Sequence, residues 1–507
     1  MALAWRFVLW SNSQCLLAPD PAKAGYASCY LGWQDRVVKL GKADGFGRGS
    51  VLVANFDLVV LGGGSGGYAA ALRASQLGLT VALIEKDKVG GTCLHRGCIP
   101  TKALLHAGEV ADSARESELF GVKATFNSID MNGVNSYKDG VIAGLHKGLQ
   151  GLVKLRGITY VEGTGRLVSN NTVEVNGEQY VGKNIVLATG SYARTLPGLE
   201  IDGKQVITSD HGTQMDYVPK SVIVLGGGVI GCEFASVWKS FGSEVTIIEG
   251  LPHLIALEDE SSSKLLERAY RKRGINFELG VRFKSHTVGK KGVTVTLEDG
   301  REFTADVLLV SVGRGPVTDG IGYQEVGIAI DRGYITVDDH CRTNIPGIFA
   351  VGDIIPTLQL AHVGFQEGIL VAETIAGLNP RPINYDGVPR VTYSEPEVAS
   401  MGLTTKVAKE RGYDVVEVDY NLAGNGKAQI LKTAGSIKLV AQKNGPVLGI
   451  HMVGSRVGEL VSEAQLIFNW EASADDVAPL IHAHPTLSEA MGEAHMALAG
   501  KPLHSHG

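Results

Sequence analysis

Apolar positions along the chain form short uninterrupted runs that are followed at once by glycine-rich turns. In FDLVVLGGGSGGYAAALRASQLGLTVALIE, the run from Leu58 to Leu61 precedes glycines, a helical segment and a second apolar run. This order predicts a buried strand over 58–61, a helix over 69–76 and a second strand over 81–84. The pattern therefore predicts an α/β fold.

The same order of elements occurs a second time in SVIVLGGGVIGCEFASVWKSFGSEVTIIE. Both glycine turns fit G-x-G-x-x-G, in which the first glycine makes the tight turn, the second admits a pyrophosphate and the third lets helix and strand approach. An acidic residue follows each first glycine at the same distance and can accept hydrogen bonds from a ribose. The two sets are Gly62, Gly64, Gly67 and Glu85, and Gly226, Gly228, Gly231 and Glu249.

Two dinucleotide sites in one chain predict electron transfer between two cofactors. One such motif often marks a plain loop, but two with the same flanking elements are a strong signal. The simplest pair is a tightly held flavin, FAD, and a diffusible nicotinamide. Glu249 can bond a ribose 2′-hydroxyl but would repel a 2′-phosphate, and the next three residues, Gly-Leu-Pro, bring no arginine. The second site is therefore predicted to bind NAD rather than NADP.

Length and composition exclude several classes. The 507 residues are too many for one domain, and 44% apolar with 20% charged residues is typical of a soluble globular protein. A dispersed formal charge of −6 gives no basic surface for nucleic acid, and no apolar run is long enough for membrane insertion. Six cysteines form no disulfide framework, so we expect a cytoplasmic location.

Residues 1–53 differ from the rest of the chain. They contain three of the five tryptophans and show no helical or strand periodicity. A targeting peptide is one alternative, but Arg6 and three aspartates disagree with it. We expect a disordered extension or a mis-assigned start, with the folded protein beginning near Val53.

The stretch GGTCLHRGCIPTK places four residues between Cys93 and Cys98. The following KALLHAGEVADSA predicts a helix, so the two thiols should lie near its N-terminus. The helix dipole, with His95 and Arg96 nearby, would stabilise a thiolate there. A zinc site and a static disulfide are the alternatives, but zinc needs about four ligands and no second cysteine pair or matching histidine cluster appears. A redox-active dithiol is the favoured interpretation.

Near the C-terminus, HAHPTLSEAMGEAHMALAG indicates a candidate base. Pro485 suits the first turn of a helix, which would place His484 at its mouth and Glu489 about one turn inside. A carboxylate that holds an imidazole makes a base able to deprotonate a thiol. A metal pair formed by His482 and His484 is the alternative.

Together with these motifs, the chain from about Asn55 onward resembles the flavin-dependent disulfide oxidoreductases, and within that family the branch that oxidises dihydrolipoamide. The resemblance includes VLATGS at 186–191, GIFAVGD at 347–353, LAHVGFQEG at 360–368, YSEPEVASMGL at 393–403 and HAHPTLSE at 482–489. It implies two Rossmann-like dinucleotide-binding domains and a C-terminal α+β dimerisation domain. The implied bounds are 54–198 for an FAD-binding domain with the dithiol, 199–325 for an NAD-binding domain, 326–388 for a central domain that returns to FAD, and 389–507 for the dimerisation domain.

The resemblance also implies roles for individual residues. Cys98 would lie against the flavin, and Cys93 would exchange with the substrate disulfide. Lys102 and Glu233 would pair beside the flavin, and Asp353 would bond its ribityl chain. Further cofactor contacts are implied for Thr92, Lys102, Gly190, Gly313 and Ala361, and no metal ligand is implied.

The implied reaction is oxidation of dihydrolipoamide with reduction of NAD. The lipoyl group would be carried by the acyltransferase of a 2-oxoacid dehydrogenase complex or by a glycine-cleavage carrier protein. His484 and Glu489 would complete the active site of the other subunit, so the implied assembly is a homodimer with shared sites.

Some positions depart from the commonest family pattern. His95 and Arg96 stand where Asn-Val is usual, Val317 where asparagine is common and Gly364 where alanine is frequent. Glutathione reductase and mercuric reductase are the alternatives within the family, but the first prefers NADP and the second has a terminal cysteine pair that this chain lacks. A flavin redox sensor without turnover is the alternative from another class.

Overall fold

The computed structural model describes residues 53–504. The predicted extension over 1–53 lies outside these residues except for Val53, the first residue of the first strand. Cys15 and Cys29 also lie outside them.

Seven strands form the first sheet: β1 Val53–Leu61, β2 Val81–Glu85, β3 Thr159–Glu162, β4 Gly165–Ser169, β5 Thr172–Val175, β6 Glu178–Leu187 and β19 Ile348–Ala350. Their order is β3-β2-β1-β6-β5-β4, and β19 pairs with β6. Strands β1, β2, β3, β6 and β19 pair in parallel, while β4 and β5 extend the sheet in antiparallel pairing. Strand β2 is buried along its whole length, as parallel strands between helices are.

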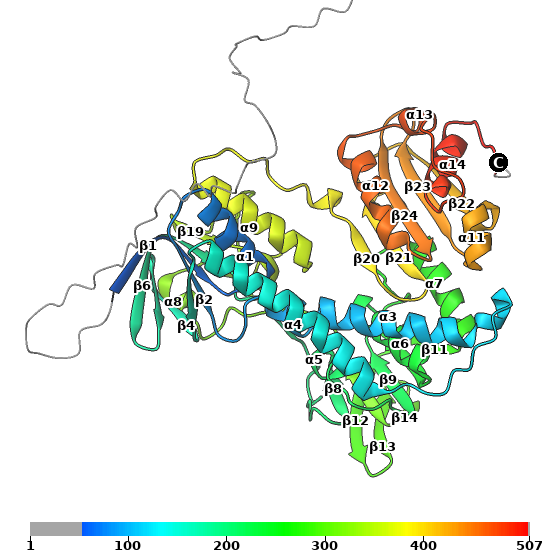
Figure 1. The fold of residues 1–507 in the computed structure, drawn as a ribbon, viewed down its shortest axis with the longest axis horizontal. Helices are drawn as coiled ribbons and strands as arrows, with labels where there is room; N and C mark the ends of the chain where they lie inside the picture. The colour runs from blue at the N-terminus through cyan, green and yellow to red at the C-terminus, as the bar shows by residue number, and fades with distance from the viewer. Residues whose placement is uncertain (1–52, 505–507) are drawn as a thin grey trace, which may run out of the picture. The chain divides into compact units, whose positions relative to one another are not determined.

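Helix α1 (Ser65–Gln76) packs along α9 (Ala361–Ile375), a segment that is distant in the sequence (Figure 1). Glycines allow this close approach, because a Cβ at Gly368 would lie 2.3 Å from the carbonyl oxygen of Gly66. Through this contact, a segment that follows the second sheet in the sequence packs on the unit that contains the first sheet.

The second sheet is entirely parallel and contains β8 Val206–Thr208, β9 Ser221–Leu225, β10 Glu244–Glu249, β11 Ile275–Leu279 and β15 Val307–Val310. Its order is β11-β10-β9-β15-β8. Helix α6 (Val229–Phe241) connects β9 to β10 as α1 connects β1 to β2. A small antiparallel sheet adjoins it, formed by β12 Phe283–Gly289, β13 Gly292–Leu297 and β14 Glu302–Ala305.

Both predicted strand–turn–helix units are present, but α1 begins at Ser65 rather than at Ala69. The intervening residues include two glycines, whose low helix propensity conceals the first helical turn from a pattern analysis. Strand β1 is likewise longer than predicted, because Asn55 and Asp57 interrupt the apolar run in its exposed or half-buried first half.

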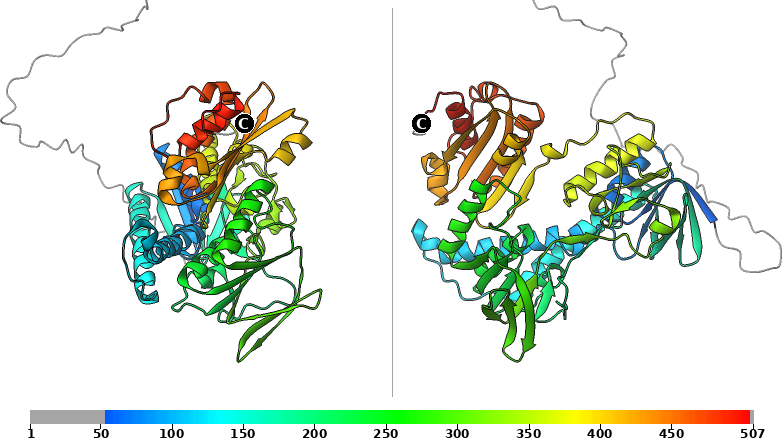
Figure 2. Two further views of the ribbon diagram at one scale, coloured as in Figure 1. Left: turned by 90° about the vertical axis from the view of Figure 1, so that its right-hand side faces the viewer. Right: turned by 180° about the vertical axis from the view of Figure 1, so that it is seen from behind.

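The C-terminal sheet is antiparallel, in the order β20-β21-β24-β23-β22, with strands at β20 Arg390–Thr392, β21 Glu397–Gly402, β22 Val415–Asn421, β23 Ser436–Gln442 and β24 Val447–Gly454. Helices α12 (Val457–Asn469) and α14 (Glu489–Leu498) pack on this sheet (Figures 1 and 2). Two Rossmann-like units and a C-terminal α+β unit confirm the predicted fold class.

Two long helices, α3 (Cys98–Arg115) and α4 (Met131–Leu155), pack against each other, and α3 also packs against α6 (Figure 1). Helix α3 therefore connects the first unit to the second. Among residues 53–504, no helix is both long and apolar enough to cross a membrane.

Candidate active site

The first glycine turn leaves space only where a ligand would approach. Gly62 has φ +108°, and a Cβ there would lie 2.2 Å from the carbonyl oxygen of Ala188. A Cβ at Gly67 would lie 1.9 Å from the carbonyl oxygen of Gly62. Gly64, in contrast, has no protein atom within 4 Å of its Cβ position, and it precedes the first residue of α1. The free amides at that helix N-terminus suit a phosphate group.

Glu85 ends β2 and faces this turn. Its Oε2 accepts a hydrogen bond from the Gly63 amide at 2.6 Å, and its Oε1 accepts one from the Asp87 amide at 2.9 Å. These two bonds fix the carboxylate at the strand end, where a ribose can reach it.

The second turn repeats this geometry. Gly226 has φ +107°, and a Cβ there would lie 2.4 Å from the carbonyl oxygen of Ser311. A Cβ at Gly231 would lie 1.9 Å from the carbonyl oxygen of Gly226, while Gly228 again has open space. Glu249 accepts hydrogen bonds from the amides of Gly227 at 2.5 Å and Leu251 at 2.7 Å. Both turns thus have the shape and donors that a dinucleotide requires.

The dithiol segment packs directly on the first of these turns. The Gly90 amide donates to the carbonyl oxygen of Gly63 at 2.8 Å. A Cβ at Gly91, which has φ +58°, would lie 2.7 Å from the Cα of Gly64. Only glycine permits this approach, so the turn and the dithiol form one site.

Cys93 lies in the short helix α2 (Gly91–His95), and Cys98 is the first residue of α3. The helix predicted after the cysteines therefore begins earlier and includes Cys98. A hydrogen bond from the Cys93 thiol lowers the pKa of Cys98 to about 7, and Lys102 acts in the same direction against burial. The same contact, with burial, raises the pKa of Cys93. Cys98 is thus the thiolate of the pair.

Lys102 and Glu233 form an ion pair between α3 and α6. The Lys102 Nζ lies 2.8 Å from both carboxylate oxygens of Glu233. Glu233 is 4% exposed, whereas Lys102 is 34% exposed. Burial opposes the charge of Lys102, but Glu233 raises its pKa above the ordinary value. The pair therefore presents an ammonium group beside the Cys98 thiolate.

His95 and Arg96 were expected to stabilise the thiolate, and this prediction is wrong for Arg96. Its guanidinium bonds Asp87 at 2.9 Å and faces Asp210 at 3.9 Å. His95 bonds the carbonyl oxygen of Val89 and packs edge-on against His146. Lys102, one helical turn after Cys98, is the cation that acts on the thiols.

Two residues of α1 that the sequence reasoning missed lie beside the dithiol. The Ser65 side chain acts on the Cys93 thiol and lowers its pKa, against the larger effects of Cys98 and burial. Burial, together with the negative charge of the cysteines, raises the pKa of Tyr68 to about 12. Both residues lie in the SGGY stretch of the first glycine motif. Their position in that motif was the sequence feature that could have identified them as site residues.

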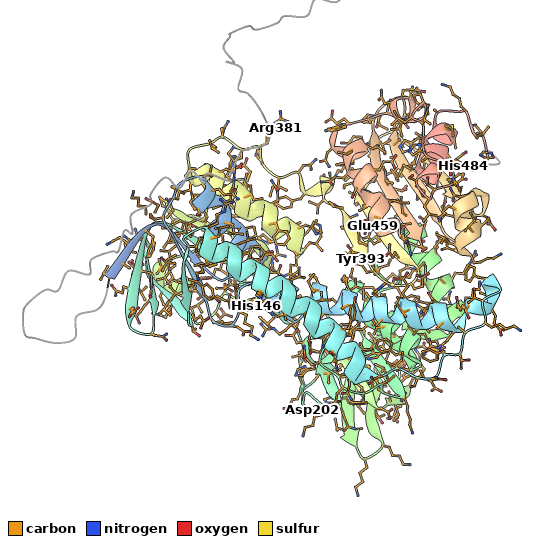
Figure 3. All side chains as sticks on the ribbon, in the orientation of Figure 1. His146, Asp202, Arg381, Tyr393, Glu459 and His484 are labelled. Carbon is orange, nitrogen blue, oxygen red and sulfur yellow. The ribbon has the colours of Figure 1, made fainter. Side chains whose placement is uncertain are left out.

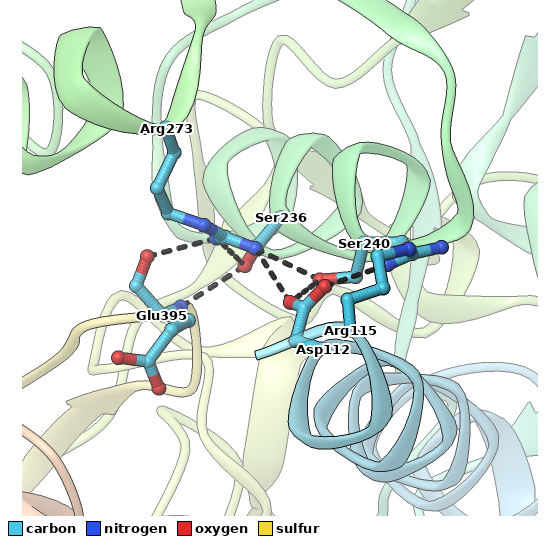
Figure 4. A network of polar contacts seen from close by, with 6 residues as sticks. All are labelled: Asp112, Arg115, Ser236, Ser240, Arg273 and Glu395. Atoms are coloured by element: carbon cyan, nitrogen blue, oxygen red, sulfur yellow. Dashed lines mark hydrogen bonds and ion pairs between the residues drawn. The ribbon is translucent and has the colours of Figure 1, made fainter. Parts of the chain in front are cut away.

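A polar network fixes α3 against the second unit (Figure 4). Arg273, in helix α7 (Glu260–Arg273), donates to Ser236 at 2.8 Å, to Ser240 at 2.8 Å and to Asp112 of α3 at 3.1 Å. It also donates to the backbone oxygen of Glu395 at 2.9 Å. The network therefore ties the dithiol helix to α6, α7 and the start of the C-terminal unit.

Asp353 lies in the 3-10 helix η2 (Gly352–Ile354), directly after β19. Its carboxylate accepts a hydrogen bond from Ser191 and lies 4.0 Å from the guanidinium of Arg314. Gly190 and Gly313 have φ values of +73° and +106°, which favour glycine where the chain leaves β6 and β15. Thr92 lies in α2 beside Cys93, and Ala361 is the first residue of α9.

Glu367 was not predicted as a site residue, although it stands in the motif LAHVGFQEG. It is fully buried and accepts hydrogen bonds from the Gly352 amide at 2.6 Å, Thr357 at 2.8 Å and Tyr385 at 3.0 Å. Burial raises its pKa to about 7. The sequence feature that could have identified Glu367 is an ionisable residue within an apolar helix. Its hydrogen bond from the Gly352 amide holds the segment that carries Asp353.

His484 and Glu489 form the predicted pair, with His484 Nδ1 2.8 Å from Glu489 Oε1. The prediction that Pro485 opens a helix is wrong, because α14 begins at Glu489. The His484–Pro485 peptide is cis, and a loop presents His484 with 78% of its side chain exposed. Burial opposes ionisation of Glu489, but the Thr486 amide and His484 lower its pKa.

Within residues 53–504, no hydrogen bond or ion pair joins His484 to either cysteine. Figure 3 shows His484 well apart from Tyr393, which adjoins Lys102. The His482 ring lies 2.7 Å from the Glu463 carboxylate and does not pair with His484. No group of three side chains that could bind a metal occurs in the described part of the chain. One chain alone therefore does not bring the candidate base to the dithiol.

Comparisons with known proteins agree with this geometry. Residues 56–368 match the pyridine nucleotide-disulphide oxidoreductase family model, and residues 388–495 match the dimerisation domain of that family. The chain belongs to the pyridine nucleotide-disulphide oxidoreductase family. The domains of this family bind FAD and NAD, and the two glycine turns described above fit these cofactors.

Several relatives of the chain are named dihydrolipoyl dehydrogenase. The chain is 42% identical over 473 residues to a dihydrolipoyl dehydrogenase from Bacillus subtilis, covering 89% of this chain and 100% of that protein. It is 40% identical over 463 residues to mitochondrial dihydrolipoyl dehydrogenase 1 from Arabidopsis thaliana, covering 88% and 91% of the two chains. The crystal structure of LpdA from Mycobacterium tuberculosis is similar with a TM-score of 0.82 and 26% identity, covering 88% of this chain and 100% of that one.

Proposed function

We propose that this protein is a dihydrolipoyl dehydrogenase, which oxidises dihydrolipoamide to lipoamide and reduces NAD. The observation that carries the proposal is the contact between the dithiol segment and the first dinucleotide turn, through Gly90 and Gly91. The Lys102–Glu233 pair then reaches from the dithiol helix to α6, the helix that follows the second turn. The named activity of the relatives supports this choice.

In the proposed reaction, His484 of the second subunit of a homodimer removes a proton from dihydrolipoamide, with Glu489 holding the imidazole. The substrate thiolate attacks the Cys93 sulfur and breaks the Cys93–Cys98 disulfide, which leaves Cys98 as a thiolate. The second substrate thiol then displaces Cys93, which takes up the proton that this thiol loses, so lipoamide leaves with Cys93 as a thiol and Cys98 as a thiolate. Bound FAD supplies the transfer of the two electrons from the dithiol to NAD.

The residues around the dithiol and the glycine turns each have a defined role in these reaction steps. Lys102 stabilises the Cys98 thiolate, and Glu233 keeps Lys102 charged. Cys93 keeps its proton near neutral pH because its pKa is raised, so it leaves Cys98 as the anion of the reduced pair. The glycine turns and the carboxylates Glu85 and Glu249 hold the two dinucleotides.

The assignment of FAD to the first turn and NAD to the second can be tested at the two open glycines. Gly228→Ala should weaken NADH binding on the order of 10- to 100-fold and leave FAD fully bound, because a methyl group there meets ligand rather than protein. Gly64→Ala should instead lower the FAD content of purified protein. Gly140→Ala in α4, which also points to open space, is the matched control. If Gly228→Ala lost FAD and Gly64→Ala did not, the order of the two sites would be reversed.

The preference for NAD is expected to depend on Glu249. Its carboxylate should repel a 2′-phosphate and favour NADH over NADPH on the order of 100-fold in kcat/KM. Glu249→Gln should reduce that preference while FAD stays bound. Lipoamide reduction with each nucleotide is the measurement, and equal rates with NADH and NADPH in the unmodified protein would contradict the assignment.

The proposed partner is a lipoyl-bearing acyltransferase of a 2-oxoacid dehydrogenase complex or a glycine-cleavage carrier protein. The dimerisation-domain match supports the homodimer. A cytoplasmic location remains part of this proposal.

Two relatives at 39% identity, from Vigna unguiculata and Glycine max, are named leghemoglobin reductase. Glutathione and mercuric reduction and a sensor without turnover are the other candidates. Two assays decide among them: dihydrolipoamide is tested with NAD as the electron acceptor, and oxidised glutathione, mercuric ion and ferric leghemoglobin are each tested with NADH as the electron donor. The proposal requires dihydrolipoamide oxidation to have the highest kcat/KM, and it fails if this activity is absent from FAD-loaded dimer.

A further inference from the structure

Tyr393 joins the C-terminal unit to the Lys102–Glu233 pair. It follows β20, and the residue is 38% exposed. Figure 3 labels it near the base of the C-terminal unit. Lys102 comes from α3, Glu233 from α6 and Tyr393 from the segment between β20 and β21, so three parts of the chain meet at this point.

The backbone of Tyr393 contacts the carboxylate. Its amide donates a hydrogen bond to Glu233 Oε1 at 3.0 Å. Glu233 is almost completely buried, and a buried carboxylate is costly unless donors satisfy its oxygens. The amide adds a donor to the two contacts from Lys102 and does not depend on the side chain at position 393.

The side chain of Tyr393 contacts the ammonium. Lys102 Nζ lies 4.7 Å from the ring centroid, within the distance at which an aromatic face attracts a cation. Burial raises the pKa of the Tyr393 phenol, so the ring is neutral at physiological pH. The ring therefore holds Lys102 without neutralising its charge.

We propose that Tyr393 is a positioning residue for the disulfide chemistry, and that its ring holds the Lys102 ammonium against the Cys98 thiolate. The inference rests on the proposed function, because it assigns Cys98 the role of thiolate beside bound FAD. It extends that function by giving the C-terminal unit a direct influence on the thiol of its own chain, separate from the contribution of His484 to the second subunit.

The charges around these groups favour this role. Of the three side chains that act most strongly on the Cys98 thiol, Cys93, Lys102 and Glu233, Lys102 is the positive one. Tyr393 is in turn close to Lys102, Glu397, Glu233 and Glu459. Losing the ring would expose the ammonium to more water and free its side chain to move, and the thiolate would lose part of the positive charge that Lys102 supplies.

The test uses FAD-loaded protein in which Cys93→Ser leaves Cys98 as the single thiol of the pair. The Cys98 thiolate beside oxidised flavin gives a long-wavelength absorbance, and its midpoint in a pH titration reports the pKa of Cys98. Adding Tyr393→Leu should move the midpoint upward by about half a unit to one unit, while Tyr393→Phe should leave it nearly unchanged. The sign follows because a weaker positive charge favours the protonated thiol. Tyr413→Leu, at an exposed tyrosine without an assigned role, is the matched control.

The outcomes separate this inference from the proposed function. An unchanged midpoint in Tyr393→Leu, with FAD content equal to that of the parent, overturns the role of the ring. A shift of equal size in Tyr393→Phe also overturns it, because the hydroxyl group would then be responsible. The absence of the absorbance at every pH in the Cys93→Ser parent would instead contradict the placement of Cys98 beside FAD.

Discussion

Replacing Cys93 by serine is expected to abolish dihydrolipoamide oxidation, with a loss in kcat of at least about 10³-fold, while NADH still reduces the bound flavin. Serine retains a donor to Cys98 but cannot form the mixed disulfide through which the substrate is oxidised. Steady-state turnover and anaerobic NADH reduction of the flavin are the two measurements. Loss of turnover with unchanged flavin reduction is the result expected for a residue that exchanges with substrate.

Cys98→Ser provides the contrast. It should also lose turnover, and it should lose the long-wavelength absorbance that Cys93→Ser keeps, because Cys98 carries the thiolate. If Cys93→Ser retained turnover, or if the absorbance followed Cys93, the assigned roles of the two thiols would be wrong. Comparable FAD content in both variants shows that the fold is retained.

Replacing His484 by glutamine is expected to lower kcat for dihydrolipoamide oxidation by about 10²- to 10⁴-fold, the usual contribution of a general base. Glutamine can keep a hydrogen bond to Glu489 but cannot accept the substrate proton. FAD content and reduction of the flavin by NADH should stay unchanged, since His484 contacts neither glycine turn.

His106→Gln is the matched control for that experiment. His106 Nδ1 lies 2.9 Å from Glu109 Oε2, so it forms a similar exposed histidine–carboxylate pair without an assigned role. An equal loss of activity in both variants would indicate a general effect of removing such a pair. A loss of FAD in His484→Gln would indicate damage to the fold rather than loss of a base.

The local geometry of the nucleotide sites was readable from the sequence. Gly62 and Gly226 require positive φ, and Gly67 and Gly231 lie against carbonyl oxygens, so no other residue fits these positions. Such constraints act over a few neighbouring residues and leave a direct pattern in the chain. The same applies to the buried strands β1 and β9, whose apolar runs follow from burial on both faces.

The start of α14 and the partner of Arg96 could not be read in this way. Pro485 is compatible with a helix start, but it lies in a loop, because α14 begins only at Glu489. Arg96 stands between the cysteines, yet it turns toward Asp87 and Asp210. In both cases the decision depends on contacts with residues that the local sequence does not contain.

The sequence by itself determined the two glycine turns, the spacing of the thiols and the order of the strands and helices, because steric and burial constraints on neighbouring residues select the amino acids there. Only the tertiary structure decided that the cation acting on Cys98 is Lys102 rather than Arg96, and that the Tyr393 ring lies 4.7 Å from the Lys102 ammonium. Glu233 and Tyr393 lie far from Lys102 in the chain, and their interaction energies with it arise only when packing of the sheets and helices brings them within a few ångströms.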